Sequence, residues 1–435
     1  MESLIVEGKN TLRGRVRISG SKNISLPLIA ASLLTDDPVI IEDVPCLRDV
    51  HIMLEIVSEI GAEIRFQKRN LYLDTSTANS FTAPQSLASQ MRASFLVLGP
   101  LLARFGRAKI YPPGGCSIGS RPVDLHQKGL AALGVKFTPE NGCIEAYCNR
   151  LIGSHIYLDF PSVGATENIM MAATMAEGET IIENAAREPE IIELSGLLTA
   201  MGAIISGAGT HTIRIKGVYS LKGTRYRVIP DRIEAGTYMI AAAIAGNRVT
   251  IENVIMDHLK PLTDKLKEAG VQVKEFEPGE VTLIPPSSIK AVNIKTMPYP
   301  GFPTDLQPPF SSLMTQAHGM GTIRETVFEN RFRHVNGLTK MGADVQFNGQ
   351  SLIIRGSRKL WGKRVRATDL RGAASLVLAA LVAEGRTEIQ EVHHLDRGYE
   401  DLALKMYNLG ANVHRESSRQ QFTFASLQNR SNLRG

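Results

Sequence analysis

A helix-ending motif recurs six times along the chain at nearly constant spacing. Each copy has an apolar helix-ending residue, then a glycine, then a short segment that reads as a strand, as in IGAEIRF and MGADVQF. Successive glycines are 73, 68, 68, 72 and 68 residues apart. A glycine here is typical of a helix C-terminal cap, where a positive φ costs least without a Cβ. The chain therefore reads as six related units, whose glycines are Gly61, Gly134, Gly202, Gly270, Gly342 and Gly410.

Each unit carries two helices of different character. The first, for example AGTYMIAAAIA or AASLVLAALVA, is apolar on every face, which predicts complete burial. The second, for example LKPLTDKLKEAG, is amphipathic, and segments of alternating polarity such as LIIRG read as strands. The fold class that follows is α/β: six β-α-β-α-β-β units with buried helices and outer sheets.

The units are expected to form two domains of three units each. The register places the switch near Val228 to Pro230, so that 22–229 form one domain and 230–435 most of the other. Residues 1–21 precede the first helix and are expected to pair with the C-terminal half. A continuous solenoid is the alternative, but fully apolar inner helices favour two closed globules.

The composition is that of an ordinary globular protein of 435 residues, 43% hydrophobic and 21% charged. No run approaches 18 apolar residues and the first residues do not resemble a signal peptide, so no membrane segment and a cytoplasmic location are expected. Four cysteines cannot build a disulfide framework, and the mild net charge of +6 does not by itself imply nucleic acid.

Cations recur at equivalent helix starts. The turn into the first helix carries Lys22, Arg92, Arg232 or Arg371 in four units, Asp305 in a fifth, and Val163 with Gly164 in the third. A helix N-terminus already carries partial positive charge, so repeated cations there predict a bound anion in a cleft between the domains. The second helices repeat the pattern: Arg48, Arg121 and Arg397 each lie 13 residues before their glycine, and Arg331 lies 11 before its own.

The second unit is lengthened by PPGGCSIGSRP, residues 112–122. Its prolines and glycines predict a hinged loop with Cys116 at the tip and Arg121 nearby. The other cysteines, Cys46, Cys143 and Cys148, are expected to be small buried hydrophobes. No metal-ligand spacing, P-loop or strand-linked GxGxxG occurs, so neither a metal nor another cofactor is expected.

The motifs together resemble the bacterial UDP-N-acetylglucosamine enolpyruvyl transferases. The resemblance spans nearly the whole chain, and its most specific parts are the cysteine loop and HLDRGYE at 394–400. It implies an inside-out α/β barrel of two three-unit domains. Departures from the family pattern are Ser21, Gly372 and the tract LQPPFSSLMTQAHG after Asp305, which affect the local helix start and not the reaction.

The resemblance also implies a reaction. The 3′-hydroxyl of UDP-N-acetylglucosamine attacks C2 of phosphoenolpyruvate and phosphate is lost, the first committed step of peptidoglycan synthesis. Cys116 would be the general acid and the site of a covalent phosphoenolpyruvate or fosfomycin adduct, and Asp305 the candidate base. Lys22, Arg121 and Arg397 would hold phosphoenolpyruvate, with Asn23 beside the reacting centre.

The remaining implied residues surround these. The UDP-sugar contacts would be Arg92, Arg121, Pro122, Val123, Asp124, Leu125, Ser162, Val163, Gly164, Asp305 and Val327, and the supporting residues Arg232, Arg331, Asp369 and Arg371.

Three alternatives stay open at this point. One is the sister reaction on shikimate 3-phosphate, whose enzymes lack the cysteine loop. Another is a ring-shaped nucleic-acid clamp, whose inner helices would be polar rather than apolar. The third is a regulatory paralogue with the same fold. Oligomeric state is left undetermined by the sequence.

Overall fold

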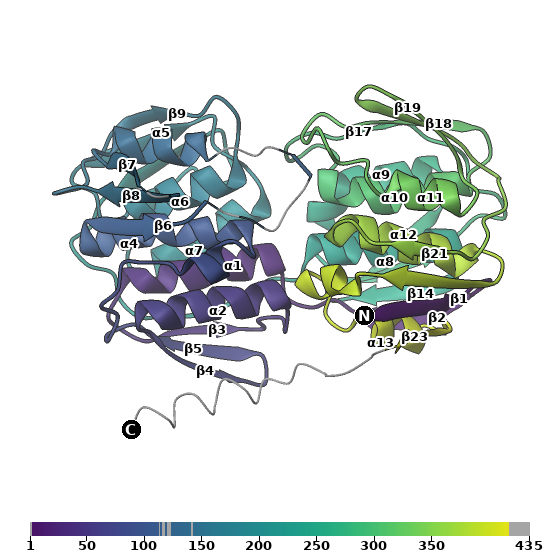
Figure 1. The fold of residues 1–435 in the computed structure, drawn as a ribbon, viewed down its shortest axis with the longest axis horizontal. Coiled ribbons are helices and arrows are strands. Elements are labelled where there is room, and N and C mark those ends of the chain that lie inside the picture. The colour runs from purple at the N-terminus through teal and green to yellow at the C-terminus, as the bar shows by residue number, and fades with distance from the viewer. Residues whose placement is uncertain (1, 113, 115–117, 120–122, 141, 417–435) are drawn as a thin grey trace.

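Two lobes lie side by side along the long axis of the molecule (Figure 1). The computed structural model describes residues 2–112, 114, 118–119, 123–140 and 142–416. Among these residues the buried apolar side chains form two clusters, which define the lobes. The cluster of lobe 1 runs from Ile24 to Val228. The cluster of lobe 2 takes Leu4 to Ile18 from the N-terminus and continues from Ile233 to Val413.

The first helix of each unit is buried, as its composition predicts. In α12 (Leu370–Val382) every residue from Arg371 to Leu381 is buried. Helix α8 (Arg232–Ala245) is buried on nearly every face. The first-helix segments are α1 (Lys22–Ala31), η2 (Arg92–Val97) with α4 (Leu98–Phe105), α6 (Val163–Ala173), α8 (Arg232–Ala245), η4 (Thr304–Leu306) with α10 (Gln307–Thr315), and α12 (Leu370–Val382). The atypical tract after Asp305 is thus helical, with prolines in the first turn of α10, where a missing N–H costs least.

The six predicted capping glycines follow the second helices, and all of them have positive φ, between 95° and 113°. The prediction of helix ends is therefore confirmed. The second helices are α2 (Arg48–Ile60), α5 (Asp124–Ala132), α7 (Pro189–Ala200), α9 (Lys260–Glu268), α11 (Val335–Lys340) and α13 (Leu402–Asn408). Short helical turns complete the set: η1 (Ser32–Leu34), α3 (Gln85–Ala88), η3 (Met256–Leu259) and η5 (Val392–Arg397).

Six sheets form the outer layer, one for each unit. Their strands alternate between buried and solvent-facing residues, as in β12, because one face packs on the helices. In lobe 1 the strand orders are β13 (Arg225–Arg227)-β3 (Val39–Glu42)-β5 (Asn70–Asp74)-β4 (Glu63–Gln67), then β6 (Arg107–Ile110)-β8 (Cys143–Tyr147)-β7 (Lys136–Glu140), and β11 (Ile204–Ser206)-β12 (Thr212–Lys216)-β10 (Glu179–Glu183)-β9 (His155–Tyr157).

Lobe 2 repeats this arrangement with help from the N-terminus. Its strand orders are β15 (Gln272–Glu277)-β16 (Glu280–Ile284)-β14 (Gly246–Glu252)-β2 (Leu12–Arg17), then β17 (Ile294–Lys295)-β18 (Met320–Arg324)-β20 (Ser351–Arg355)-β19 (Asp344–Asn348), and β21 (Arg364–Arg366)-β22 (Arg386–Gln390)-β1 (Ser3–Glu7)-β23 (Val413–Glu416). Each lobe therefore has buried helices inside and sheets outside, as predicted.

The two lobes exchange strands. β2, which precedes α1 of lobe 1, pairs in parallel with β14 of lobe 2, whereas β13, which precedes α8 of lobe 2, pairs in parallel with β3 of lobe 1. Strand β1 lies between β22 and β23, so the N-terminal segment pairs with the C-terminal half as the register predicts. Figure 1 shows these purple strands in the lobe that holds the green and yellow helices.

The two exchanged segments cross at Gly20 and Pro230, which form an antiparallel bridge. Ser21 N donates to Ile229 O at 2.9 Å and Asp231 N donates to Ser19 O at 2.9 Å. A Cβ on Gly20 would lie 1.9 Å from the carbonyl oxygen of Asp43, so only glycine fits at this crossing.

The three described cysteines do not share one environment. Cys143 is buried in β8 and Cys148 is half-buried beside it, as expected of small hydrophobes. The expectation for Cys46 is wrong, because its residue is exposed in the connection that leads into α2. Cys116 lies outside the described residues.

We expect Gly202→Ala to lower the free energy of unfolding by about 1–2 kcal/mol, the cost of a left-handed backbone for a residue with a Cβ. Its φ is +107° and nothing lies within 4 Å of the added Cβ, so backbone strain is isolated from steric overlap. The measurement is the urea midpoint. Gly202→Asn, which tolerates positive φ better, should lose less, and an alanine variant as stable as wild type would contradict the assignment.

Candidate active site

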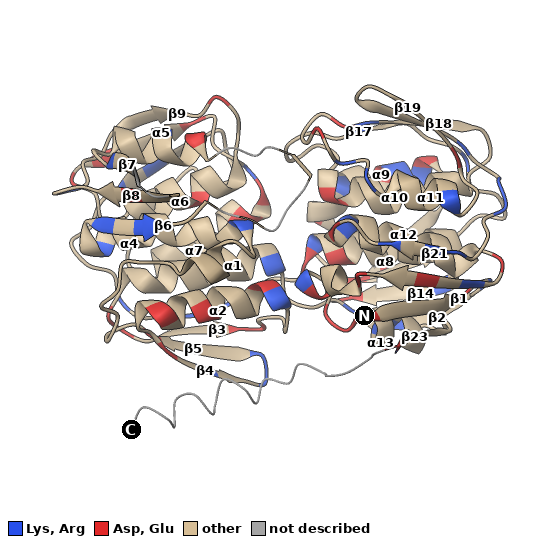
Figure 2. Ribbon diagram, viewed as in Figure 1, with Lys and Arg blue, Asp and Glu red and all other residues tan. Residues whose placement is uncertain are grey.

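A cavity of about 700 Å³ lies between the lobes. The start of each of the six first-helix segments contributes to its wall, so six partly positive helix ends converge on one space. Figure 2 shows Lys, Arg, Asp and Glu gathered at the helix ends that face the other lobe, while most of the length of the inner helices is uncharged.

The structure brings the predicted site residues together. Those that are described all line the cavity: Lys22, Asn23, Arg92, Val123, Asp124, Leu125, Ser162, Val163, Gly164, Arg232, Asp305, Val327, Arg331, Asp369, Arg371 and Arg397. Cys116, Arg121 and Pro122 lie outside the described residues. Nearby in the same loop, Ile118 is buried in the cavity wall and its carbonyl accepts from Asn330 N of lobe 2 at 2.9 Å.

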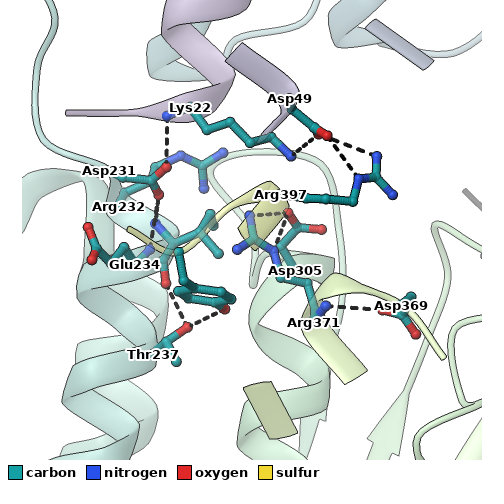
Figure 3. Close-up of polar contacts among 12 residues, drawn as sticks. Lys22, Asp49, Asp231, Arg232, Glu234, Thr237, Asp305, Asp369, Arg371 and Arg397 are labelled. Carbon is teal, nitrogen blue, oxygen red and sulfur yellow. Dashed lines mark hydrogen bonds and ion pairs between the residues drawn. The ribbon is translucent and has the colours of Figure 1, made fainter. Parts of the chain in front are cut away.

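One carboxylate joins two predicted substrate cations across the lobes. Asp49, only 1% exposed, lies 3.1 Å from Lys22 Nζ, and its two oxygens accept from Arg397 Nε and Nη2 at 2.9 and 3.3 Å (Figure 3). Burial by itself would raise the pKa of Asp49, but the charges of Lys22 and Arg397 outweigh it and lower the pKa. Asp49 is therefore ionised and holds both cations in place.

A second carboxylate, Asp305, is held by two buried arginines of its own lobe. Its Oδ1 accepts from Arg331 Nη2 at 2.7 Å and its Oδ2 accepts from Arg371 Nε at 3.1 Å. Burial would raise the pKa of Asp305, but Arg371 and Arg331 hold it well below the usual carboxyl range. Two nitrogen atoms of these arginines, Arg331 Nε and Arg371 Nη1, are buried and have no hydrogen-bond partner among the described residues.

Two further aspartates cap the starts of α12 and α8, the helices that carry Arg371 and Arg232. Asp369 caps α12 by accepting from Arg371 N and Gly372 N at 3.1 and 3.0 Å. Asp231 caps α8 by accepting from Ile233 N and Glu234 N at 2.8 and 2.9 Å. Such caps set the direction of the first turn and of the side chains on it.

Lobe 1 also contributes three buried glutamates to the cavity wall, Glu167, Glu188 and Glu190. Glu190 forms an ion pair with Arg232 across the lobes at 3.1 Å. Burial, together with the charges of the other two, raises the pKa of Glu167 well above its usual value. A protonated Glu167 can donate a hydrogen bond.

The nearby start of α6 is a conventional anion-binding element. Ser162 caps the helix by accepting from Ala165 N at 3.4 Å, and a Cβ on Gly164 would lie 3.3 Å from the ring of His126. His126 is buried and its Nδ1 lies 3.0 Å from Asn168 Nδ2. The absence of a Cβ at Gly164 thus lets the backbone of 163–164 lie close to His126 on α5.

Sequence reasoning missed the acidic half of the site. It singled out Arg48 at the start of the second helix, but Arg48 is exposed and does not line the cavity, whereas the next residue, Asp49, does. The signal was available, because a carboxylate in the first turn of a helix is favourable and Asp49 occupies that turn. Glu190 occupies the first turn of α7 in the same way.

The arrangement can bind anions and hold a hydroxyl beside a carboxylate. Within the described residues no group of His, Cys, Asp and Glu could hold a metal ion, and no helix is both long and apolar enough to cross a bilayer.

Comparison with known proteins gives the family. Residues 6–406 match the model of EPSP synthase (3-phosphoshikimate 1-carboxyvinyltransferase). The chain belongs to this family of enolpyruvyl transferases. A family member from Caldanaerobacter subterraneus subsp. tengcongensis, UDP-N-acetylglucosamine 1-carboxyvinyltransferase 1, is 53% identical over 412 residues, 95% of this chain and 99% of that relative. UDP-N-acetylglucosamine 1-carboxyvinyltransferase 2 of Carboxydothermus hydrogenoformans is 53% identical over 418 residues, 96% of this chain and 100% of its own.

Solved family structures share the fold. The enolpyruvyl transferase NikO from Streptomyces tendae is 28% identical with a TM-score of 0.87 and covers 96% of this chain and 99% of its own. The EPSP synthase from Acinetobacter baumannii, 20% identical, has a TM-score of 0.75 and covers 96% and 100% of the two chains. Both comparisons confirm the predicted fold class.

We expect Asp49→Asn to lower the free energy of unfolding by about 2–4 kcal/mol, because it removes the buried negative charge that two largely buried cations share. The measurement is urea denaturation. The matched control is Asp257→Asn, which removes a fully exposed carboxylate paired with Lys260 and should have no measurable effect. Equal stabilities of the two variants would contradict the structural role of Asp49.

Proposed function

We propose that this protein transfers the enolpyruvyl group of phosphoenolpyruvate to the 3′-hydroxyl of UDP-N-acetylglucosamine and releases phosphate. The observation that carries the proposal is the cavity in which Lys22, Arg397 and Asp305 of two lobes meet, in a chain 53% identical to proteins named for this reaction. The reaction would take place in the cytoplasm as the first committed step of peptidoglycan synthesis. The lobes would be the two domains, 22–229 and 1–21 with 230–435.

The phosphoenolpyruvate subsite is proposed to lie at Lys22 and Arg397. Phosphate and carboxylate match the charge and donors of these side chains, and arginine can bind two oxygens at once. Asp49 forms ion pairs with the same cations, so the substrate would share them with this carboxylate or replace it. Arg121, outside the described residues, is predicted to complete this subsite.

The UDP-sugar is proposed to lie toward lobe 1. Arg92, Asp124 and the start of α6 at Ser162 line that part of the cavity, and a helix N-terminus with a nearby arginine suits a diphosphate. Asn23 and Val327 would flank the reacting sugar. Arg232, Arg331 and Arg371 would support the cavity wall through their carboxylate partners.

The proposed steps balance as an addition and an elimination. The sugar oxygen adds to C2 of phosphoenolpyruvate, Cys116 is predicted to protonate C3, and Asp305 is predicted to accept the hydroxyl proton. The C2–O bond to phosphate then breaks and C3 loses a proton, which leaves the enolpyruvyl ether and inorganic phosphate. Because the pKa of Asp305 is low, its proton transfer would accompany bond formation, when the hydroxyl has become more acidic.

We expect phosphate release only when phosphoenolpyruvate and UDP-N-acetylglucosamine are both present. A coupled phosphate assay with each acceptor in turn is the measurement. Shikimate 3-phosphate should give no release, and Cys116→Ser should lower the rate about 10²-fold or more if the thiol is the general acid. Turnover with shikimate 3-phosphate instead would overturn the proposed substrate, and full activity of Cys116→Ser would overturn the proposed acid.

The pKa of Asp305 also predicts the pH profile. A carboxylate whose pKa is lowered stays ionised as pH falls, so the acid limb of kcat/KM from this group should lie below the usual carboxyl range. Arg371→Met removes a cation that lowers this pKa, so the limb should move to higher pH. Arg214→Met, on an exposed outer strand of lobe 1, should leave it unchanged. An unmoved limb in Arg371→Met would exclude Asp305 as the titrating group.

A further inference from the structure

The segment between Glu391 and Asp401 of lobe 2 is bounded by unusual backbone. Both residues have positive φ, 60° and 48°, although neither is glycine. Such conformations persist only where surrounding contacts over-determine them, and they cluster at functional sites. This docking segment, 391–401, carries Arg397, which lines the cavity, and Glu400, which does not.

Glu400 is anchored to lobe 1 from outside the cavity. Its carboxylate is 6% exposed and its Oε1 accepts from Cys46 N at 2.8 Å. Its Oε2 accepts from Ser19 Oγ at 2.5 Å and forms an ion pair with Arg69. Of these partners, Cys46 and Arg69 belong to lobe 1, and Ser19 lies next to Gly20 in the segment that crosses between the lobes.

The position of Arg69 is itself constrained. Lys68 and Arg69 form the two-residue turn between β4 and β5, with φ of 47° and 67°. Turns of this kind usually contain asparagine and glycine, because those residues adopt positive φ most easily. The carbonyl of Arg69 accepts from Val44 N at 2.9 Å, which ties the turn to the connection that contains Cys46.

Two contacts of the docking segment reach lobe 1 at matching spacing along the two chain segments. Arg397 reaches Asp49, and Glu400, three residues later, reaches Cys46, three residues earlier. The two contacts therefore fix both the place and the direction of this segment relative to the start of α2.

We propose that Arg69 and Glu400 are a positioning pair that docks the segment 391–401 on lobe 1 and thereby places Arg397 for substrate. The proposal rests on the proposed function, in which Arg397 binds phosphoenolpyruvate. Neither member of the pair touches the cavity, so their effect passes through the backbone of the docking segment. They are distinct from Asp49, which contacts Arg397 directly.

The network around Glu400 decides which variant is safest. Ser19 Oγ also accepts from Lys405 Nζ at 2.7 Å, and Lys405 pairs with the buried Glu234 at 2.6 Å. Removing Glu400 disturbs this buried network as well as the docking contact. The side chain of Arg69 is 42% exposed, so Arg69→Ala removes the cation at the surface and should leave folding intact.

The kinetic experiment compares Arg69→Ala, Arg69→Lys, Glu400→Gln and the double variant Arg69→Ala/Glu400→Gln. Arg69→Ala is expected to lower kcat/KM for phosphoenolpyruvate about tenfold, the size of one charge-assisted hydrogen bond, while KM for UDP-N-acetylglucosamine changes little. Arg69→Lys should restore part of the loss. The double variant should lose less than the product of the single losses, because both act through one contact.

Arg364→Ala is the matched control. It removes an exposed lobe 2 arginine that is paired with Glu388 on an outer sheet, and it should leave both kinetic constants unchanged. Equal kinetics of Arg69→Ala and this control, or losses in the double variant that multiply fully, would overturn the proposal.

A readout without substrate separates this proposal from the proposed function. Amide hydrogen exchange at Cys46, whose N–H donates to Glu400, should be faster in Arg69→Ala than in wild type or Arg364→Ala. Unchanged exchange would overturn the docking role whatever reaction the protein catalyses. Faster exchange in a protein that releases no phosphate would leave the docking intact and count against the proposed function alone.

Discussion

The carboxylate of Asp231 holds the starts of two helices that belong to different lobes. Its Oδ1 caps α8 of lobe 2, and its Oδ2 accepts from the backbone N–H of Lys22, the first residue of α1 in lobe 1, at 3.1 Å (Figure 3). This contact is available because the exchanged segments cross at Gly20 and Pro230. The direction of α1, and with it the place of Lys22 in the cavity, thus depends on a residue 209 positions away.

Convergence of helix starts and cations would be unfavourable without buried anions. Asp49 forms ion pairs with Lys22 and Arg397, Asp305 with Arg331 and Arg371, and Glu190 with Arg232. Breaking such a pair is costly because it leaves a buried charge uncompensated. An anion that binds Lys22 and Arg397 would share these cations with Asp49, whose contacts join the two lobes.

Most of the fold could be predicted from the repeat period of the sequence. Glycines such as Gly202, fully apolar helices such as α12 and the pairing of the N-terminus were predictable, because each depends on local conformation or on a pattern repeated in register. Cations at helix starts were predictable for the same reason. Asp49 was not singled out, since its role appears only when Arg397, 348 residues later, is folded against it.

Other features depend on contacts that no local pattern encodes. Cys46 is exposed because its backbone, and not its thiol, makes the contact between lobes. The ion pair of Arg69 and Glu400 joins a hairpin turn to a segment 331 residues later, and no local pattern connects the two residues. The register placed residues 1–21 with the C-terminal half and 22–229, which include β13, in the other domain, but it did not indicate which strands β2 and β13 pair with.

The central claim is that the cations now held by Asp49 form the phosphoenolpyruvate subsite. A crystal structure of the protein with phosphoenolpyruvate and UDP-N-acetylglucosamine tests it most directly. The account predicts phosphate or carboxylate oxygens within about 3 Å of Lys22 Nζ and the Arg397 guanidinium, with the sugar hydroxyl beside Asp305. Substrate bound elsewhere in the cavity, with Lys22 and Arg397 still paired only to Asp49, would contradict it.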